Sequence, residues 1–155
     1  MANSTRFQYE RGADPWEKRI PRDTDVLITH TPPQYHLDLN LGCAGLLNEI
    51  WRVRPRLHVF GHVHSGHGRE FVFWDEGQKA YERLMAGHKA GIFADVFPSY
   101  AWLDSLKVLW YGVKGCIWQR LMVGPSGGNG GILVNAALVY QSTTDIGNPV
   151  EIVEL

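Results

Sequence analysis

Three histidines follow two short apolar segments of the sequence and could together bind a metal ion. His30 comes directly after the apolar run of residues 25–29, while His62 and His64 follow the run of residues 56–60. Both runs are typical of buried strands, and parallel strands present the residues at their carboxyl ends along one edge of a sheet. Imidazole nitrogen is a good ligand for zinc, iron and manganese. These residue types at these positions therefore predict a metal site.

The segments around these histidines are expected to form neighbouring strands. The run of residues 25–29 is stopped by the proline pair at 32–33. Residues 42–53 then have the apolar spacing of a helix that ends before Pro55, and residues 56–60 form the next strand. This strand, helix, strand order favours two parallel strands in an α/β layer arrangement.

Gly61 precedes the closely spaced histidines and is expected to permit a sharp turn. A glycine adopts backbone conformations that other residues avoid, so it lets His62 and His64 point at different targets.

The rest of the chain is predicted to hold a third strand, a helical segment and two closing strands. The third strand covers residues 70–74, and residues 78–123 are mostly helical in pattern. The apolar residues of this segment recur near the helical period and predict a helix packed on the sheet; they are Trp102, Leu106, Leu109, Val113, Ile117 and Leu121. A membrane-surface helix is the alternative, since Trp102 and Trp110 alternate with lysines. Residues 132–140 and 150–155 are expected to form the closing strands.

Two of these segments resemble motifs of a known family. The sequence Thr-His-Thr-Pro-Pro at 29–33, followed by Phe-Gly-His-Val-His at 60–64, is similar to the last two metal motifs of calcineurin-like metallophosphoesterases. Residues 21–25, 134–136 and 147–149 are similar to the small single-domain branch of that superfamily, and the resemblance runs from about Phe7 onward.

The resemblance implies a site with two divalent metal ions (manganese, iron or zinc) that hydrolyses phosphomonoesters or phosphodiesters. By this resemblance His30 and His62 bind one metal and His64 binds the other. A phosphoester or nucleotide-like small molecule is the expected substrate. The implied fold is α/β, the C-terminal part of a four-layer α/β/β/α sandwich with a mixed sheet whose N-terminal half is missing. Residues 1–155 then form one partial domain with a helical insert at about 78–123.

The earlier motifs of this family, Asp-x-His, Gly-Asp and Gly-Asn-His, do not occur before His30. In the family they supply the bridging aspartate, further metal ligands and the histidine usually assigned as general acid. Three neutral imidazoles alone compensate little of the charge of two dications. We therefore expect weak or no activity from this chain alone, no assignable catalytic residue, and an apolar sheet face left open.

Three further polar residues are candidates for a supporting or substrate-binding role. Asn135 lies in an apolar strand and needs a hydrogen-bond partner if it is buried, so it is a candidate brace for a ligand loop. His36 follows the double proline and His67 follows the histidine pair; both are candidate cleft residues, although a structural or solvated role is the simpler interpretation.

The composition argues against two classes of binding partner. A net charge of −1 gives no reason to expect nucleic acid or an anionic membrane. The polar N-terminus lacks the apolar run of a signal peptide, so we expect a cytoplasmic protein.

Two other functions remain open. One is a non-catalytic truncated paralogue that binds a partner, such as a second copy or the missing half, through the open sheet face. The other is a mononuclear metal barrel such as a cupin, in which His62 and His64 lie on a strand and both point inward, with Glu70 as a late acidic ligand.

Overall fold

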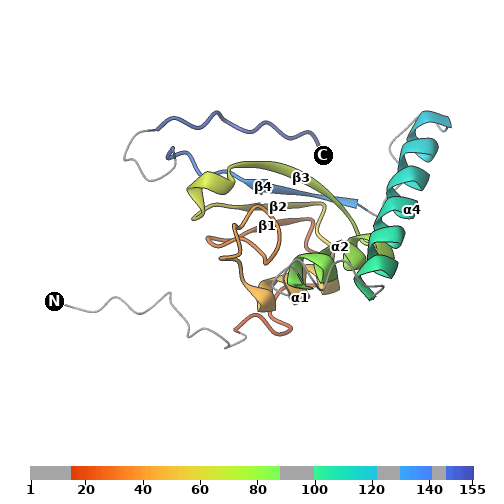
Figure 1. Ribbon diagram of the computed structural model, residues 1–155. Coiled ribbons are helices and arrows are strands. Elements are labelled where there is room, and N and C mark those ends of the chain that lie inside the picture. Colours follow the sequence, from red (N-terminus) through yellow and green to blue (C-terminus); the bar gives the residue numbers. More distant parts are fainter. Residues whose placement is uncertain (1–14, 88–99, 122–129, 141–145) are drawn as a thin grey trace.

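The core of the structure is a mixed four-stranded sheet with helices on one side (Figure 1). The computed structural model describes residues 15–87, 100–121, 130–140 and 146–155. Within them the strand order is β1-β2-β4-β3. The strands are β1 (Val26–Ile28), β2 (Leu57–Phe60), β3 (Gly68–Phe73) and β4 (Gly130–Asn135). The α/β class with a mixed sheet is confirmed for the described part of the chain.

The first two strands are parallel neighbours, as the strand, helix, strand order predicts. β1 pairs with β2 and β2 pairs with β4 in parallel, whereas β3 is antiparallel to β4. The carboxyl ends of β1 and β2 therefore lie at one edge, where His30 and His62 follow them.

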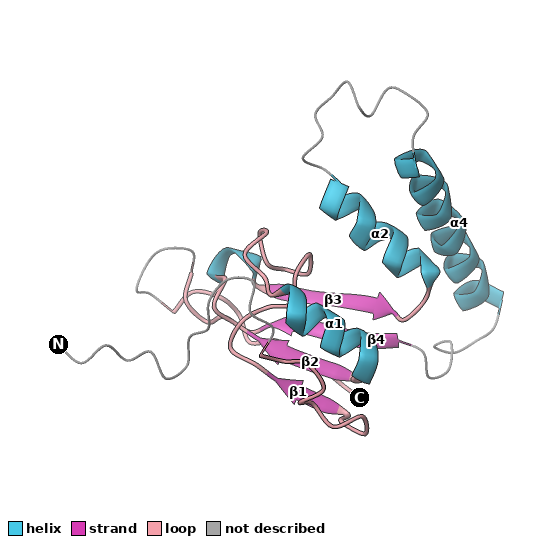
Figure 2. Cartoon of the chain, turned by 90° about the horizontal axis from the view of Figure 1, so that it is seen from below, coloured by secondary structure: helices cyan, strands magenta, loops and turns pink. Residues whose placement is uncertain are grey.

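Helix α1 (Ala44–Val53) connects these two strands and covers one face of the sheet (Figure 2). Its first turn is capped by Cys43, whose Sγ accepts a hydrogen bond from the Leu46 backbone N–H. It ends at Arg54, which takes the left-handed conformation and donates its N–H to the carbonyl of Ile50. The predicted helix at 42–53 is confirmed.

The hydrophobic core lies between α1 and the sheet. Leu46 and Ile50 on α1 are fully buried against strand residues that point to the same side. Those strand residues are Leu27, Phe60, Val72 and Leu133. Because strand side chains alternate between faces, the residues adjacent to these four along each strand point away from α1.

The opposite face of the sheet is apolar and partly open. The strand register places Val26, Leu57, Ile132 and Phe71 in one row across all four strands. Phe71 is 62% exposed, and Ile28 in the next row is 74% exposed. The open apolar face that we expected is therefore present; we define it by its exposed members Val26, Ile28, Phe71 and Phe73.

The expected last strand is wrong. Residues 150–155 form no strand and instead pass on the side of the sheet opposite α1 (Figure 1). The segment is tied to the sheet through side chains, since Arg69 Nη1 donates to the Ile152 carbonyl at 3.4 Å. A strand needs a backbone edge to pair with, and this segment lies over a face. The strand expected at 132–140 is also shorter and ends at Asn135.

Helices α2 (Glu76–Gly87) and α4 (Tyr100–Leu121) form in the region that the sequence pattern predicts to be mostly helical. The prediction that this helix packs on the sheet is wrong. Helix α4 packs along α2 and lies outermost, away from the sheet (Figure 2). Residues such as Leu106 and Leu109 of α4 are exposed to solvent rather than buried on the sheet. His88 and most of the glycine-rich loop lie outside the described residues.

No helix in the described part of the chain has the length and apolar character to cross a membrane.

Candidate metal centre

His30 and His62 come together at the carboxyl ends of β1 and β2. His30 Nε2 lies 3.1 Å from His62 Nδ1, and the two ring centroids are 4.9 Å apart. Both side chains are exposed to solvent. The Gly61 N–H donates to the His30 carbonyl at 3.1 Å, so the backbone also joins the two loops.

The spacing of these two nitrogens suits one shared metal ion. Two ligands at ~2.1 Å from one metal, at the angles of octahedral or tetrahedral coordination, lie roughly 3.0–3.4 Å apart. His30 Nε2 and His62 Nδ1 form a hydrogen bond of 3.1 Å, and this length also falls in that range, so a bound metal ion would replace the shared proton. The distance between the two nitrogens is therefore compatible with two positions of one metal coordination sphere.

His62 holds an unusual backbone conformation. Its φ of 66° lies in the left-handed region, which is costly for a residue other than glycine. The expectation that Gly61 makes the sharp turn is thus corrected: Gly61 has no positive φ, and the histidine itself makes the turn. The conformation brings the His62 ring beside His30.

His64 is not grouped with this pair. It begins the short 3-10 helix η1 (His64–Gly66) and is half-buried. Among the described residues, no three side chains of His, Cys, Asp or Glu are arranged to hold one metal ion. The structure thus brings together two of the three predicted histidine ligands. Because His62 and His64 lie in a loop and a 3-10 helix rather than a strand, the barrel alternative is not supported.

Asn135, at the end of β4, connects both histidine loops. Its Nδ2 donates to the Val63 carbonyl at 2.8 Å and to the Leu37 carbonyl at 3.2 Å. Its Oδ1 accepts from the Ala137 N–H at 3.2 Å. The fully buried amide therefore fixes the backbone between His62 and His64 to the loop that follows His30.

Gly66 makes the contact between the same two loops close. A Cβ atom at this position would lie 2.1 Å from the Leu37 carbonyl oxygen. No side chain fits there, so the glycine sets how closely η1 approaches the loop at residues 34–42.

His36 is buried in an ionic cluster and does not face a cleft. It is 1% exposed, with Nδ1 at 3.2 Å from Glu70 Oε2 and Nε2 at 3.3 Å from Glu82 Oε1. The Nδ1 contact is an ion pair without hydrogen-bond geometry. Burial alone lowers the pKa of a histidine, but the two carboxylates outweigh it and raise the pKa of His36 to about 9. Carboxylates lie at both ring nitrogens, so the structure places His36 in the structural role that the sequence analysis took as the simpler interpretation.

Glu82 has a second partner in the same cluster. Glu82 also accepts two hydrogen bonds from Trp51 Nε1, at 2.8 and 3.0 Å. Sequence reasoning missed the Glu82 partner, since nothing in the spacing of α2 residues signals a contact with a distant loop. Glu70 and Glu82 contact His36 and are not grouped with His30 or His62.

His58 and His67 have structural partners. Thr29 Oγ1 donates its single proton to the Thr31 carbonyl, so it accepts from His58 Nε2 at 2.9 Å. Burial, with the charge of His36, lowers the pKa of His58 to about 3. His67 Nε2 lies 3.0 Å from the Pro149 carbonyl.

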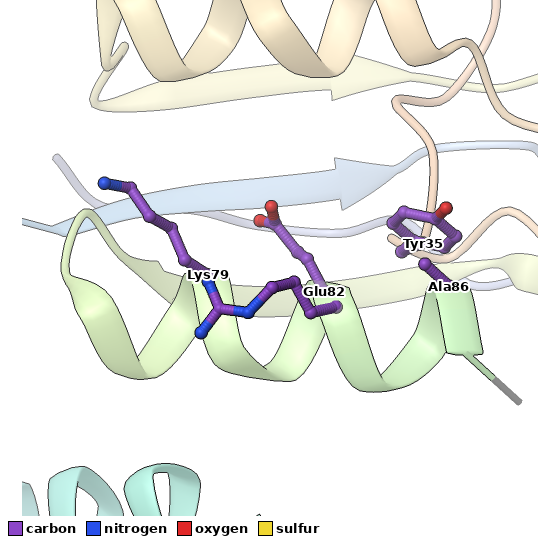
Figure 3. A pocket seen from close by; sticks show the side chains of 5 residues that line it. Tyr35, Lys79, Glu82 and Ala86 are labelled. Carbon is purple, nitrogen blue, oxygen red and sulfur yellow. The ribbon is translucent and has the colours of Figure 1, made fainter. Parts of the chain in front are cut away.

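A pocket of about 270 Å³ lies beside α2 (Figure 3). Lys79, Glu82 and Ala86 line it from the helix, and the Tyr35 side chain lies next to Ala86. Its lining charges are paired, because Lys79 contacts Glu76 at 2.7 Å and Arg83 contacts Asp104. This pocket carries no free charge with which to select a ligand.

Comparison with known proteins supports part of the resemblance. Metallophosphoesterase domain-containing protein 1 of Homo sapiens is 48% identical over 71 residues, which are 40% of this chain and 22% of that protein. UPF0046 protein T07D4.2 of Caenorhabditis elegans is 49% identical over 71 residues, 40% of the chain and 18% of that protein. Part of this chain is similar to metallophosphoesterase domain-containing proteins.

A longer match is to a protein with a different name. The probable rhamnogalacturonate lyase C of Emericella nidulans is 45% identical over 138 residues, 86% of this chain but 12% of that protein. The chain thus spans less than a quarter of the length of each of these three relatives. No family model and no solved structure matches the chain.

Proposed function

We propose that this chain carries the histidine part of a metal-dependent phosphoesterase domain that cleaves phosphomonoesters or phosphodiesters. His30 and His62 would hold one divalent metal ion, and His64 would contribute to a second. The observation that carries the proposal is the 3.1 Å distance between His30 Nε2 and His62 Nδ1 at the carboxyl ends of adjacent parallel strands. The partial similarity to metallophosphoesterase domain-containing proteins supports it.

The residues of this chain would orient the metal rather than complete the reaction. Bound divalent metal would supply Lewis-acid chemistry at a phosphoryl oxygen and a more acidic bound water. Asn135 would hold the two histidine loops in a fixed position relative to each other, as its hydrogen bonds to Val63 and Leu37 indicate. Since no described carboxylate lies with the histidine pair, turnover by this chain alone is expected to be weak or absent.

Cobalt substitution tests the proposal through a readout other than activity. Titration of the chain with Co²⁺ is expected to give visible absorption bands of imidazole ligation, lost in both His30→Ala and His62→Ala. His67→Ala is the matched control. His67 follows His64 closely in the sequence, but its Nε2 contacts the Pro149 carbonyl. Equal spectra for His67→Ala and His62→Ala would contradict the assignment. Hydrolysis of bis(p-nitrophenyl) phosphate with added Mn²⁺ then measures whether any turnover depends on the same two histidines.

A second candidate function is a non-catalytic, dimerising module. The open apolar face favours it, since Ile28 and Phe71 are exposed on a face that a second copy would cover. Light scattering would then give a dimer that Ile28→Glu dissociates, while Trp110→Glu on the outer helix has no effect. A monomer at micromolar concentration would contradict this candidate.

A further inference from the structure

Helix α4 is attached to the protein through one stripe of side chains. Ala101, Asp104, Val108, Tyr111 and Gly115 recur at helical spacing and are all half-buried. Asp104 accepts two hydrogen bonds from Arg83 of α2, at 2.6 and 3.0 Å. A Cβ atom at Gly77 of α2 would lie 2.6 Å from Tyr111 Cβ, which shows how closely the two helices approach. This stripe fixes which side of α4 faces the protein.

The outward side of α4 carries a continuous apolar surface. At 100° per residue its large apolar side chains cover an arc of roughly 120°. Every one of them is between 47% and 68% exposed. They are Trp102, Leu103, Leu106, Leu109, Trp110, Val113 and Ile117, which we call the outer arc. An apolar surface of this extent on a soluble fold is normally covered by a partner.

The charges beside the outer arc are positive. Lys107 and Lys114 follow Leu103 and Trp110 by one helical turn and lie along the same border. The single acidic residue of the helix, Asp104, is on the α2 side and is paired with Arg83. Lys107 Nζ lies 4.0 Å from Asp104, and Lys114 lies over the Tyr111 ring at 5.9 Å. Both contacts are long and exposed, so the ammonium groups stay available to another anion.

This combination fits the surface of an anionic bilayer better than a second copy of the helix. Tryptophan and leucine enter the boundary between headgroups and acyl chains, while lysines bordering them reach lipid phosphates. In an antiparallel pair centred on Trp110, Lys107 of one copy would lie near Lys114 of the other, and like charges oppose that pairing. The net charge of −1 for the whole chain gave no reason to expect a membrane, but the exposed side of α4 carries a local positive border.

We propose that α4 docks on the surface of anionic lipid bilayers through its outer arc, with Lys107 and Lys114 on the lipid phosphates. The helix lies in the plane of the surface, because its other side is tied to α2 by Asp104 and Tyr111.

Vesicle sedimentation of the full chain tests this proposal. The chain is expected to bind mixed phosphatidylcholine–phosphatidylserine vesicles, with a blue shift of tryptophan fluorescence, and to bind pure phosphatidylcholine vesicles less. Trp110→Glu is expected to weaken binding at least about tenfold, since it replaces an inserted ring with a charge. Lys107→Glu with Lys114→Glu is expected to remove the preference for phosphatidylserine.

Phe71→Glu is the matched control, because it places the same charge on the exposed apolar sheet face. It is expected to bind vesicles as the parent chain does. The proposal is overturned if the parent binds neither vesicle, or if Trp110→Glu and Phe71→Glu bind equally. A dimer that Trp110→Glu dissociates, without vesicle binding, would also overturn it and assign the outer arc to a second copy. Circular dichroism of each variant checks that the helices are intact.

Discussion

Asn135 Nδ2 donates a hydrogen bond of 2.8 Å to the carbonyl of Val63, the residue between His62 and His64. A second bond from the same nitrogen reaches Leu37, so one buried amide on β4 holds both loops of the candidate metal centre. The geometry of the site thus depends on a residue that is expected to touch neither metal nor substrate.

Replacing this amide is expected to loosen the metal centre. Asn135→Ala leaves the Val63 and Leu37 carbonyls without their donor, which should cost about 1–3 kcal/mol of unfolding free energy. The histidine loops then lose their common support, and we expect metal affinity to fall about 10–100-fold. Urea unfolding and calorimetric Zn²⁺ titration measure the two effects. Ser105→Ala, at an exposed site on α4, serves as control and should change neither quantity.

The left-handed backbone of His62 predicts that glycine and alanine at this position differ in stability. His62→Gly should be more stable to unfolding than His62→Ala by roughly 1 kcal/mol, because glycine adopts a φ of 66° without strain. Both variants should lose metal binding equally. Urea unfolding of the two variants side by side measures the difference. A more stable alanine variant would show that His62 is not left-handed in solution.

Gly66 and Gly61 are expected to tolerate alanine very differently. Gly66→Ala places a Cβ atom against the Leu37 carbonyl and should cost more than about 2 kcal/mol of stability, because backbone must move. Gly61→Ala meets nothing within 4 Å and should cost well under about 1 kcal/mol. Thermal and urea unfolding compare them. Equal losses would contradict the close approach of η1 to the loop at residues 34–42.

The buried His36 cluster predicts a loss of stability at alkaline pH. The pKa of His36 is raised from 6.5 to about 9, so the folded state holds the proton more tightly than the unfolded state. The resulting stabilisation is complete below pH 6.5 and is lost as the pH rises through about 9. Its size is roughly 3 kcal/mol at most.

His36→Gln isolates this contribution. The variant keeps a donor for Glu82 but cannot carry the charge. It should be less stable than the parent chain at pH 6, and the difference should shrink by pH 9. Urea unfolding at a series of pH values measures it. A difference that does not change with pH would mean that His36 is neutral in the folded protein.

The sequence predicted the part of the fold that depends on local pattern. The apolar runs around Leu27 and Val59 form the expected parallel strands, and the spacing of Leu46 and Ile50 defines α1. The position of His30 and His62 at neighbouring strand ends followed from these elements alone. Parallel strands have their carboxyl ends at the same edge of the sheet.

Other features depend on contacts that local pattern does not contain. The His36 cluster joins a loop, a strand and a helix that are distant in sequence, and no periodicity marks such a contact. The left-handed backbone of His62 depends on tertiary contacts, since a histidine rarely adopts this conformation on local preference alone. The outward side of α4 has the same periodicity as a buried helix, so the pattern predicted a helix but placed its apolar side wrongly.

Metal stoichiometry decides whether His30 and His62 share a metal ion. The purified chain is loaded with Mn²⁺ or Zn²⁺, excess metal is removed, and metal per chain is measured by elemental analysis beside His62→Ala and His67→Ala. Bound metal is expected in the parent chain and in His67→Ala, and loss of metal is expected in His62→Ala. Metal content in the parent chain no higher than in His62→Ala would contradict the claim that His30 and His62 share a metal ion.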